Sequence, residues 1–193
     1  MAATANPDKL IEIVAALSGF DILARPPDLG EVEETGRTLM DNARLKARAV
    51  ADHAQHAAVA DDTGLEVVAL DGAPGVYSAR YAGPNATYLD NVEHLLEEME
   101  GITDRRARFE TVALVAFPDG TELSAVGAVE GTIATVPRGT GGFGYDPVFI
   151  PEGGGGMTFA EMSKQAKGAH SHRGRAFALL AQLLTERWAD VAP

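Results

Sequence analysis

Two β-rich runs joined by a tight-turn signal constrain the fold of this chain more than any other stretch. Residues 108–117 and 122–134 are rich in apolar and β-branched side chains. They are separated by Pro-Asp-Gly-Thr at positions 118–121, and these residue types favour a hairpin turn. We therefore expect a long antiparallel pair of strands, which must belong to a larger sheet that helices cover.

Helical and strand patterns alternate on either side of this hairpin. The first helix is the clearest, because Asn6 can cap it and Pro7 suits its first position. Apolar spacing places Val14 and Leu89 on the buried faces of their helices. The pattern indicates an α/β fold. The predicted helices cover residues 7–19, 38–51, 87–99 and 173–188, and the predicted shorter strands cover residues 57–60 and 148–150.

Composition limits the classes of protein that this chain can join. Its 193 residues suit one domain, and no stretch reaches the run of about 18 apolar residues that a membrane span needs. The start of the chain lacks a secretory signal and there is no cysteine, which favours a cytoplasmic location. A net charge of −12 disfavours nucleic acid polymers. Any phosphate ligand must therefore meet locally placed cations, N–H groups or a metal.

Residues 4–9, Thr-Ala-Asn-Pro-Asp-Lys, place a hydroxyl, an amide and an ammonium group at the start of the first predicted helix. Helix N-termini favour anions, because their first N–H groups lack partners within the helix and the macrodipole is positive there. The segment therefore suits a phosphate group. A plain helix start, with Asn6 as cap and Lys9 in solvent, is the alternative.

Two acidic pairs, Glu33-Glu34 and Asp61-Asp62, stand beside glycine in predicted loops. Adjacent carboxylates can hold Mg²⁺ through one or two oxygens, while water and substrate phosphate complete its shell. The second pair is the stronger candidate, because it directly follows the strand predicted at 57–60, and strand ends open into clefts. Two solvated loops of an acidic protein are the alternative.

The segment 164–173 concentrates positive charge in an otherwise acidic chain, as a polyanion pocket requires. A zinc site is the alternative, with His170 and His172 joined by His53 and His56, but no cysteine supports it. The basic side chains of the segment are Lys164, Lys167, His170, His172 and Arg173.

Glycine is concentrated in residues 138–149, Arg-Gly-Thr-Gly-Gly-Phe-Gly-Tyr-Asp-Pro-Val-Phe. Glycine lets the backbone adopt positive φ and approach a ligand closely. Phe143 could present its ring to a planar base, and Asp146 could accept hydrogen bonds from the N–H groups of that base. A glycine-rich turn without a ligand is the alternative.

In combination, six ordered motifs closely resemble the inosine triphosphate pyrophosphatase family, also called XTP/dITP diphosphatases. The resemblance spans about Ala3 to Leu184. Six motifs in one order are far more specific than any one of them. The motifs are T-A-N-P-D-K, E-E-T-G-x-T-x-x-x-N-A-x-x-K-A, A-D-D-T-G-L, G-A-P-G-V-Y-S-A-R-Y, G-T-G-G-F-G-Y-D-P-V-F and K-x-x-x-S-H-R-G-x-A.

The resemblance implies an α/β fold with an elongated mixed β-sheet and flanking helices that form two lobes around a central cleft. It implies one bilobed domain over residues 1–193, a homodimer, and Mg²⁺-dependent hydrolysis of ITP, dITP and XTP to the monophosphate and pyrophosphate. Asp62 would be the catalytic general base, and Glu34 and Asp62 would bind Mg²⁺. The substrate contacts implied are Thr4, Ala5, Asn6, Pro7, Asp8, Lys9, Lys46, Thr63, Phe143, Gly144, Tyr145, Asp146, Lys167, His172 and Arg173.

The expected mechanism follows from these assignments. Asp62, or a water molecule that it orients, would deliver the nucleophile to the α-phosphorus, and nearby cations would neutralise the charge of the leaving pyrophosphate. Donors from His172 and Arg173 would match the keto oxygen at C6 of hypoxanthine and xanthine and would reject the amino group of adenine. The cations expected to neutralise charge are Lys9, Lys46 and Lys167.

Two departures and two rival functions accompany this interpretation. His170 stands where family members carry an apolar residue, and only Met1 to Ala3 precede Thr4, fewer than the 5–6 residues of an ordinary strand. The strand expected before Thr4 would then be missing, which would remove the segment that anchors Thr4 and Asn6. The rivals are a nucleotide-binding regulatory protein without catalysis and a metal-dependent nuclease or phosphatase. The products formed from dITP distinguish them.

Overall fold

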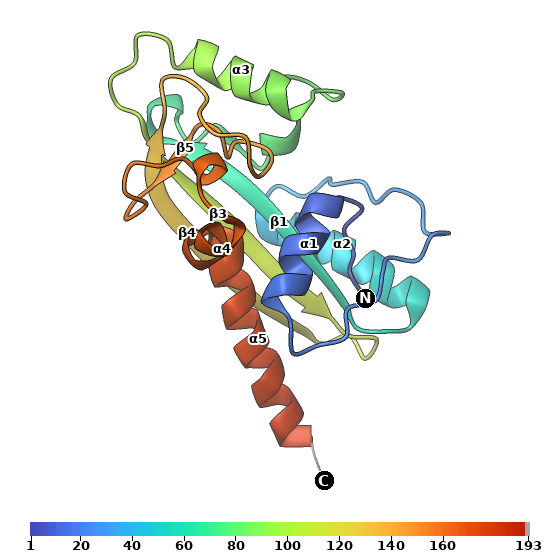
Figure 1. Ribbon diagram of the computed structural model, residues 1–193. Helices are drawn as coiled ribbons and strands as arrows, with labels where there is room; N and C mark the ends of the chain where they lie inside the picture. Colours follow the sequence, from blue (N-terminus) through green and yellow to red (C-terminus); the bar gives the residue numbers. More distant parts are fainter. Residues whose placement is uncertain (192–193) are drawn as a thin grey trace. The chain divides into compact units, whose positions relative to one another are not determined.

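The computed structural model describes residues 1–191, which form one five-stranded β-sheet together with α-helices (Figure 1). The α/β class predicted from the sequence is confirmed. The strands are arranged in the order β2-β1-β3-β4-β5. The helices are α1 (Pro7–Ala16), α2 (Leu39–Ala54), α3 (Tyr88–Glu98), α4 (Lys164–His170) and α5 (His172–Val191). The strands are β1 (Ala58–Val67), β2 (Pro74–Gly75), β3 (Arg106–Ala116), β4 (Glu122–Ile133) and β5 (Phe149–Pro151).

The predicted hairpin is present, since β3 and β4 are neighbours in the sheet (Figure 1). Its turn is closed by the Phe117 N–H, which donates to the Thr121 carbonyl at 3.0 Å, and by the Gly120 N–H, which donates to the Phe117 carbonyl at 3.0 Å. The pairs β1–β2 and β4–β5 are antiparallel as well. Parallel pairing is seen at the bridge between Ala2 and Val59, which ties the start of the chain to β1.

The chain folds as two compact units, each built from several segments. Unit 1 contains Met1–Asp62, Thr111–Gly127 and the chain from Arg173 onward, and unit 2 contains Thr63–Glu110 and Ala128–His172. Strands β1, β3 and β4 contribute residues to both units. Within residues 1–191, no helix combines the length and the apolar content that crossing a bilayer requires.

The core of unit 1 packs α1 and α5 against strand residues such as Val115. On α1, Ile13 and Leu17 are fully buried, whereas Val14 is 45% exposed, so its predicted inward position was wrong. The buried stripe of this short helix follows the four-residue step from 13 to 17, and residue 14 lies about 100° further around the helix. A cavity of about 310 Å³ opens beside this core and is lined in part by Trp188, the single tryptophan of the chain.

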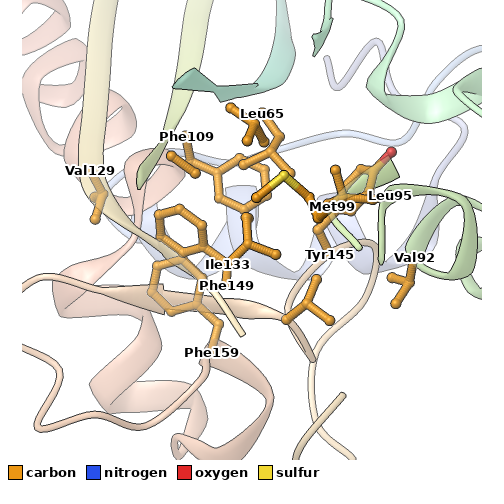
Figure 2. Close-up of a cluster of buried hydrophobic side chains, with 13 residues drawn as sticks. Leu65, Val92, Leu95, Met99, Phe109, Val129, Ile133, Tyr145, Phe149 and Phe159 are labelled. Carbon is orange, nitrogen blue, oxygen red and sulfur yellow. The ribbon is translucent and has the colours of Figure 1, made fainter. Parts of the chain in front are cut away.

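The core of unit 2 combines aliphatic side chains with a cluster of aromatic rings (Figure 2). The Phe109 ring meets Phe149 edge to face at 4.7 Å between centroids, and Phe149 stacks on Phe159 at 5.3 Å. Helix α3 adds a buried stripe that begins at Val92. Leu89, predicted to face inward, is 61% exposed because it lies in the first turn, before that stripe begins.

The segment Asp-Asp-Thr-Gly at 61–64 differs most from its prediction. It was expected to be a polar loop after a short strand, but β1 continues through it to Val67. Asp61 and Asp62 are only 2% and 5% exposed. Two buried carboxylates in a strand need charged or hydrogen-bonding partners, and the contacts of these two residues define the candidate site in unit 1.

Candidate active site

The start of α1 forms as the sequence predicts. The Asn6 side chain accepts hydrogen bonds from the N–H groups of Asp8, at 2.9 Å, and Lys9, at 3.3 Å. The Thr4 hydroxyl accepts one from the Asn6 N–H at 3.1 Å. These bonds hold residues 4–9 in a fixed turn, and they direct the Lys9 side chain toward β1.

Asp61 lies between two cations of unit 1. Its Oδ2 accepts hydrogen bonds from Arg173 Nε and Nη2, at 3.2 and 3.0 Å, and lies 3.3 Å from Lys9 Nζ. Glu12 of α1 accepts from Arg173 Nη1 at 2.7 Å. Burial alone would raise the pKa of Asp61, but Lys9 and Arg173 hold it below the ordinary range. Sequence reasoning assigned no role to Glu12, which carries no motif of its own.

Asp62 belongs to a different set of contacts, because neighbouring side chains of a strand point to opposite faces. Lys46 Nζ of α2 lies 3.0 Å from Asp62 Oδ1 and 2.8 Å from Glu34 Oε1. Asn42 Nδ2 donates to Asp62 Oδ2 at 3.2 Å. The predicted pair Glu34 and Asp62 is therefore brought together on one ammonium group.

Asn42 also explains the glycine of the Glu-Glu-Thr-Gly motif. Its Oδ1 accepts from the Gly36 N–H at 2.8 Å. A Cβ atom on residue 36 would lie 2.6 Å from that same oxygen, closer than side-chain contacts allow. Because one buried amide binds both Gly36 and Asp62, it couples the loop that carries Glu34 to strand β1.

The ionisation of this cluster favours proton transfer and anion binding. Burial raises the pKa of Asp62, and Lys46 only partly opposes this shift. Burial alone would lower the pKa of Lys46, but Asp62, Asp61 and Glu34 raise it overall, so its ammonium group is charged. Burial lowers the pKa of Lys9 despite the nearby Asp61. A carboxylate with a raised pKa is better suited to accept a proton near neutral pH than an ordinary one.

In unit 2, the predicted base-site residues gather around a buried ion pair. Lys167 Nζ lies 2.7 Å from Asp146 Oδ2, which also accepts from the Phe143 N–H at 2.7 Å. The ammonium group lies 4.7 Å from the centroid of the Phe143 ring. The exposed Tyr88 ring lies 5.9 Å from Phe143 on another side. Phe143 itself is half-buried, which leaves part of its ring accessible.

The glycines around Phe143 allow this arrangement. Gly142 has φ of +70°, and a Cβ atom there would collide with the Asp146 carboxylate. Gly139 has φ of +81°, and a Cβ atom there would collide with the backbone of Ala160. Their small size is therefore needed for close packing within the loop itself.

The remaining predicted contacts occupy varied positions. Tyr145 is buried in the aromatic core, and its hydroxyl donates to the Ser78 carbonyl at 2.9 Å. His172 is buried and stacks on Phe109 at 4.5 Å between centroids. Ser171 has an extended backbone between α4 and α5. Of the two residues that follow it, His172 packs on the Phe109 ring of unit 2 and Arg173 binds Asp61 of unit 1. Thr63 and Gly144 are half-buried.

The donor set suits a hard divalent cation that uses few protein ligands. Within residues 1–191, no group of three or more His, Cys, Asp or Glu side chains is placed to hold a metal. Glu34 and Asp62 are two carboxylates that share one cation, and Mg²⁺ commonly uses one or two carboxylates with water and phosphate. The residues present therefore fit Mg²⁺ better than a zinc ion, which takes three or four protein ligands.

The fold and these clusters define an α/β protein whose cations and carboxylates are of the kind that phosphate chemistry uses. A model of the Ham1 family matches residues 1–183, and the chain belongs to that family. A dITP/XTP pyrophosphatase of Synechococcus sp. (strain CC9311) is 52% identical over 92% of this chain and 85% of its own length. One of Caulobacter vibrioides is 50% identical over 93% and 94%. The structure of a HAM1 protein from Coxiella burnetii matches with a TM-score of 0.86 and 41% identity, covering 96% of this chain and 97% of its own.

Proposed function

We propose that this protein hydrolyses deaminated purine nucleoside triphosphates, namely ITP, dITP and XTP, to the monophosphate and pyrophosphate. The names of its relatives, dITP/XTP pyrophosphatases, support this substrate class. The single observation in this chain that carries the proposal is the position of Lys46 Nζ, 2.8 Å from Glu34 and 3.0 Å from Asp62. It gathers a cation and two carboxylates where a phosphate and a metal would both be bound.

The phosphate-binding part of the proposal falls in unit 1. Lys9 and Lys46 would contact phosphate oxygens, together with the turn of residues 4–9. Phosphoryl transfer depends mostly on positioning and charge neutralisation, which two largely buried ammonium groups supply. Arg173 forms ion pairs with Asp61 and Glu12. Lys9 also pairs with Asp61, so the two cations lie on the same carboxylate.

Asp62 would act on the attacking water molecule. Its buried carboxylate would orient the water toward the α-phosphorus and accept its proton. Asn42 would keep the carboxylate oriented. Glu34 and Asp62 would hold Mg²⁺, which when bound supplies positive charge to the phosphate oxygens.

The base-binding part falls in unit 2. Phe143 would stack on the purine, and Asp146 and His172 would meet its polar edge. Arg173 stays a predicted reader of the 6-oxo group, although Asp61 and Glu12 already bind its guanidinium. Removing Arg173 would leave the buried Asp61 carboxylate without its guanidinium partner, so His172→Gln is the cleaner test of selectivity.

Further features of the function stay predictions. These are a homodimer, a cytoplasmic location, a single bilobed domain, and the absence of nucleic acid polymers among its ligands. None of them is needed for the chemistry proposed above.

Product analysis with five nucleotides tests the proposed function. The purified protein is incubated with Mg²⁺ and ITP, dITP, XTP, GTP or ATP, and pyrophosphate and orthophosphate are measured separately. We expect pyrophosphate from the first three nucleotides and far less from GTP and ATP. Orthophosphate alone would identify a phosphatase, and binding without turnover would identify a regulatory protein.

A further inference from the structure

Lys46 occupies the carboxylate oxygens that the proposed function assigns to a divalent cation. Its Nζ lies 2.8 Å from Glu34 Oε1 and 3.0 Å from Asp62 Oδ1. The side chains of Lys46 and Asp62 are only 11% and 8% exposed. The ammonium group therefore binds Asp62 largely out of contact with solvent, whereas the Glu34 side chain is 30% exposed.

A divalent cation and this ammonium group compete for the same oxygens. Mg²⁺ binds oxygen ligands at about 2.0–2.1 Å, so an ion on Glu34 and Asp62 would lie within a few ångströms of Lys46 Nζ. Two cations at that separation repel each other strongly where solvent is largely excluded. Binding of the metal therefore requires Lys46 to withdraw from at least one carboxylate.

A lysine side chain has the rotational freedom that this withdrawal requires. Lysine carries its charge on a flexible four-carbon stem. Asp62 would keep its orientation, because Asn42 Nδ2 donates to its other oxygen, Oδ2, at 3.2 Å. Asn42 is fully buried and is fixed in turn by the Gly36 N–H. We therefore expect Asp62 and Asn42 to keep their hydrogen bond when Lys46 moves.

We propose that Lys46 is a resident counterion that competes with the divalent cation for Glu34 and Asp62, and that it moves to the substrate phosphates when metal and substrate bind. The inference rests on the proposed function, in which Lys46 contacts phosphate. Polyphosphate would draw Lys46 away from the carboxylates and so strengthen metal binding, and by linkage the metal would strengthen polyphosphate binding. If the metal bound elsewhere than on Glu34 and Asp62, removal of Lys46 would not strengthen its binding.

Binding of Mn²⁺ in the absence of nucleotide, followed by the EPR signal of the free ion, tests the competition. The wild type is compared with Lys46→Gln and with Arg44→Gln. Arg44 is the matched control, because it belongs to the same helix, is 45% exposed and contacts Glu122 at 2.9 Å. Each substitution removes one positive charge, so the control corrects for net charge.

We expect Lys46→Gln to bind Mn²⁺ at least about five-fold more tightly than the wild type, the lower end of typical couplings between two ligands. Arg44→Gln should bind Mn²⁺ as the wild type does. Equal or weaker binding by Lys46→Gln would overturn the proposal, and so would an equal gain in Arg44→Gln. If thermal unfolding shows that Lys46→Gln does not fold, Lys46→Met provides the same comparison.

Turnover is measured separately, so that the two proposals can fail independently. Pyrophosphate release from dITP by the wild type decides the proposed function. Mn²⁺ binding without nucleotide decides the competition, whatever the turnover of the variants. Suppose that the wild type releases no pyrophosphate, but Lys46→Gln binds Mn²⁺ more tightly than the wild type. The proposed function would then be wrong, and the proposed competition between Lys46 and the metal would stand.

Discussion

Units 1 and 2 bury their charges in different ways. In unit 1, ion pairs join three cations to four carboxylates. Lys46 and Arg173 each bind two carboxylates, and Lys9 shares Asp61 with Arg173. Those residues are Lys9, Lys46, Arg173, Glu12, Glu34, Asp61 and Asp62. In unit 2, the ion pair between Lys167 and Asp146 is surrounded by aromatic rings. A shared network can exchange partners during a reaction, whereas a pair packed among rings loses much stability when either member moves.

The largest expected effect tests whether the unit 1 network is catalytic. We expect Asp62→Asn to lower kcat for dITP by about 10²–10⁴-fold, because an amide cannot accept the proton of the attacking water. Pyrophosphate release measures this loss. Asp52→Asn, on the exposed end of α2, is the control and should keep wild-type turnover. Near-normal turnover of Asp62→Asn would show that the unit 1 carboxylates serve structure alone.

The next largest effect concerns stability and its dependence on pH. Asp61→Asn would leave Lys9 and Arg173 without their shared carboxylate, and breaking a buried ion pair typically costs about 3–5 kcal/mol. The folded-state pKa of Asp61 lies below the ordinary value of 3.8. Its contribution is therefore complete above that pH and is lost as the pH falls toward the folded-state value. We expect the stability difference from the wild type to be full at pH 7 and to shrink below pH 3.8.

Urea unfolding followed by the fluorescence of Trp188 measures this difference, since Trp188 belongs to unit 1. Asp52→Asn, on the exposed end of α2, is the control, and its replacement should leave the urea midpoint unchanged. A constant difference between wild type and Asp61→Asn down to pH 3 would contradict the assigned pKa direction.

A smaller effect tests how tightly the unit 2 pair is packed. Gly142→Ala would force a left-handed backbone on alanine, at about 1–2 kcal/mol, and would also push its Cβ atom into Asp146. Gly144→Ala is the matched control, because its φ is +61° and a Cβ atom there meets nothing within 4 Å. Thermal unfolding should show a larger loss for Gly142→Ala than for Gly144→Ala. Equal losses would mean that the Asp146 carboxylate can shift freely.

The sequence predicted those parts of the molecule that local chemistry decides. The Asn6 cap and the Pro118 to Thr121 turn follow from residue type alone, and both formed where expected. The path of β1 through Asp61 and Asp62 did not follow from the sequence. Two adjacent aspartates favour a loop locally, and polar partners from distant segments, among them Lys46 and Arg173, make their burial stable. The partners of buried charges are set by tertiary contacts that no local pattern encodes.

The pairing of Glu34 with Asp62 was predictable from the family motifs, whereas the ammonium group between them was not. Lys46 was expected to face phosphates, and its contacts with both carboxylates emerge only when α2 packs beside β1. The same limit applies to Glu12, whose partner Arg173 lies 161 residues away in the sequence. Residue type thus predicted which side chains matter more reliably than it predicted what each one contacts.

The smallest expected effect separates core packing from ligand contact in unit 2. Tyr145 was predicted to contact substrate, yet its hydroxyl donates to the Ser78 carbonyl inside the core. Tyr145→Phe should lower stability by about 1 kcal/mol through the loss of one buried hydrogen bond, and it should leave KM for dITP unchanged. Phe143→Leu is the contrasting variant, because its half-buried ring is the proposed stacking surface, and its KM should rise. A raised KM in Tyr145→Phe would show that the Tyr145 hydroxyl leaves the Ser78 carbonyl and binds the substrate. Unit 2 would then change hydrogen-bond partners during the reaction, as we propose for unit 1.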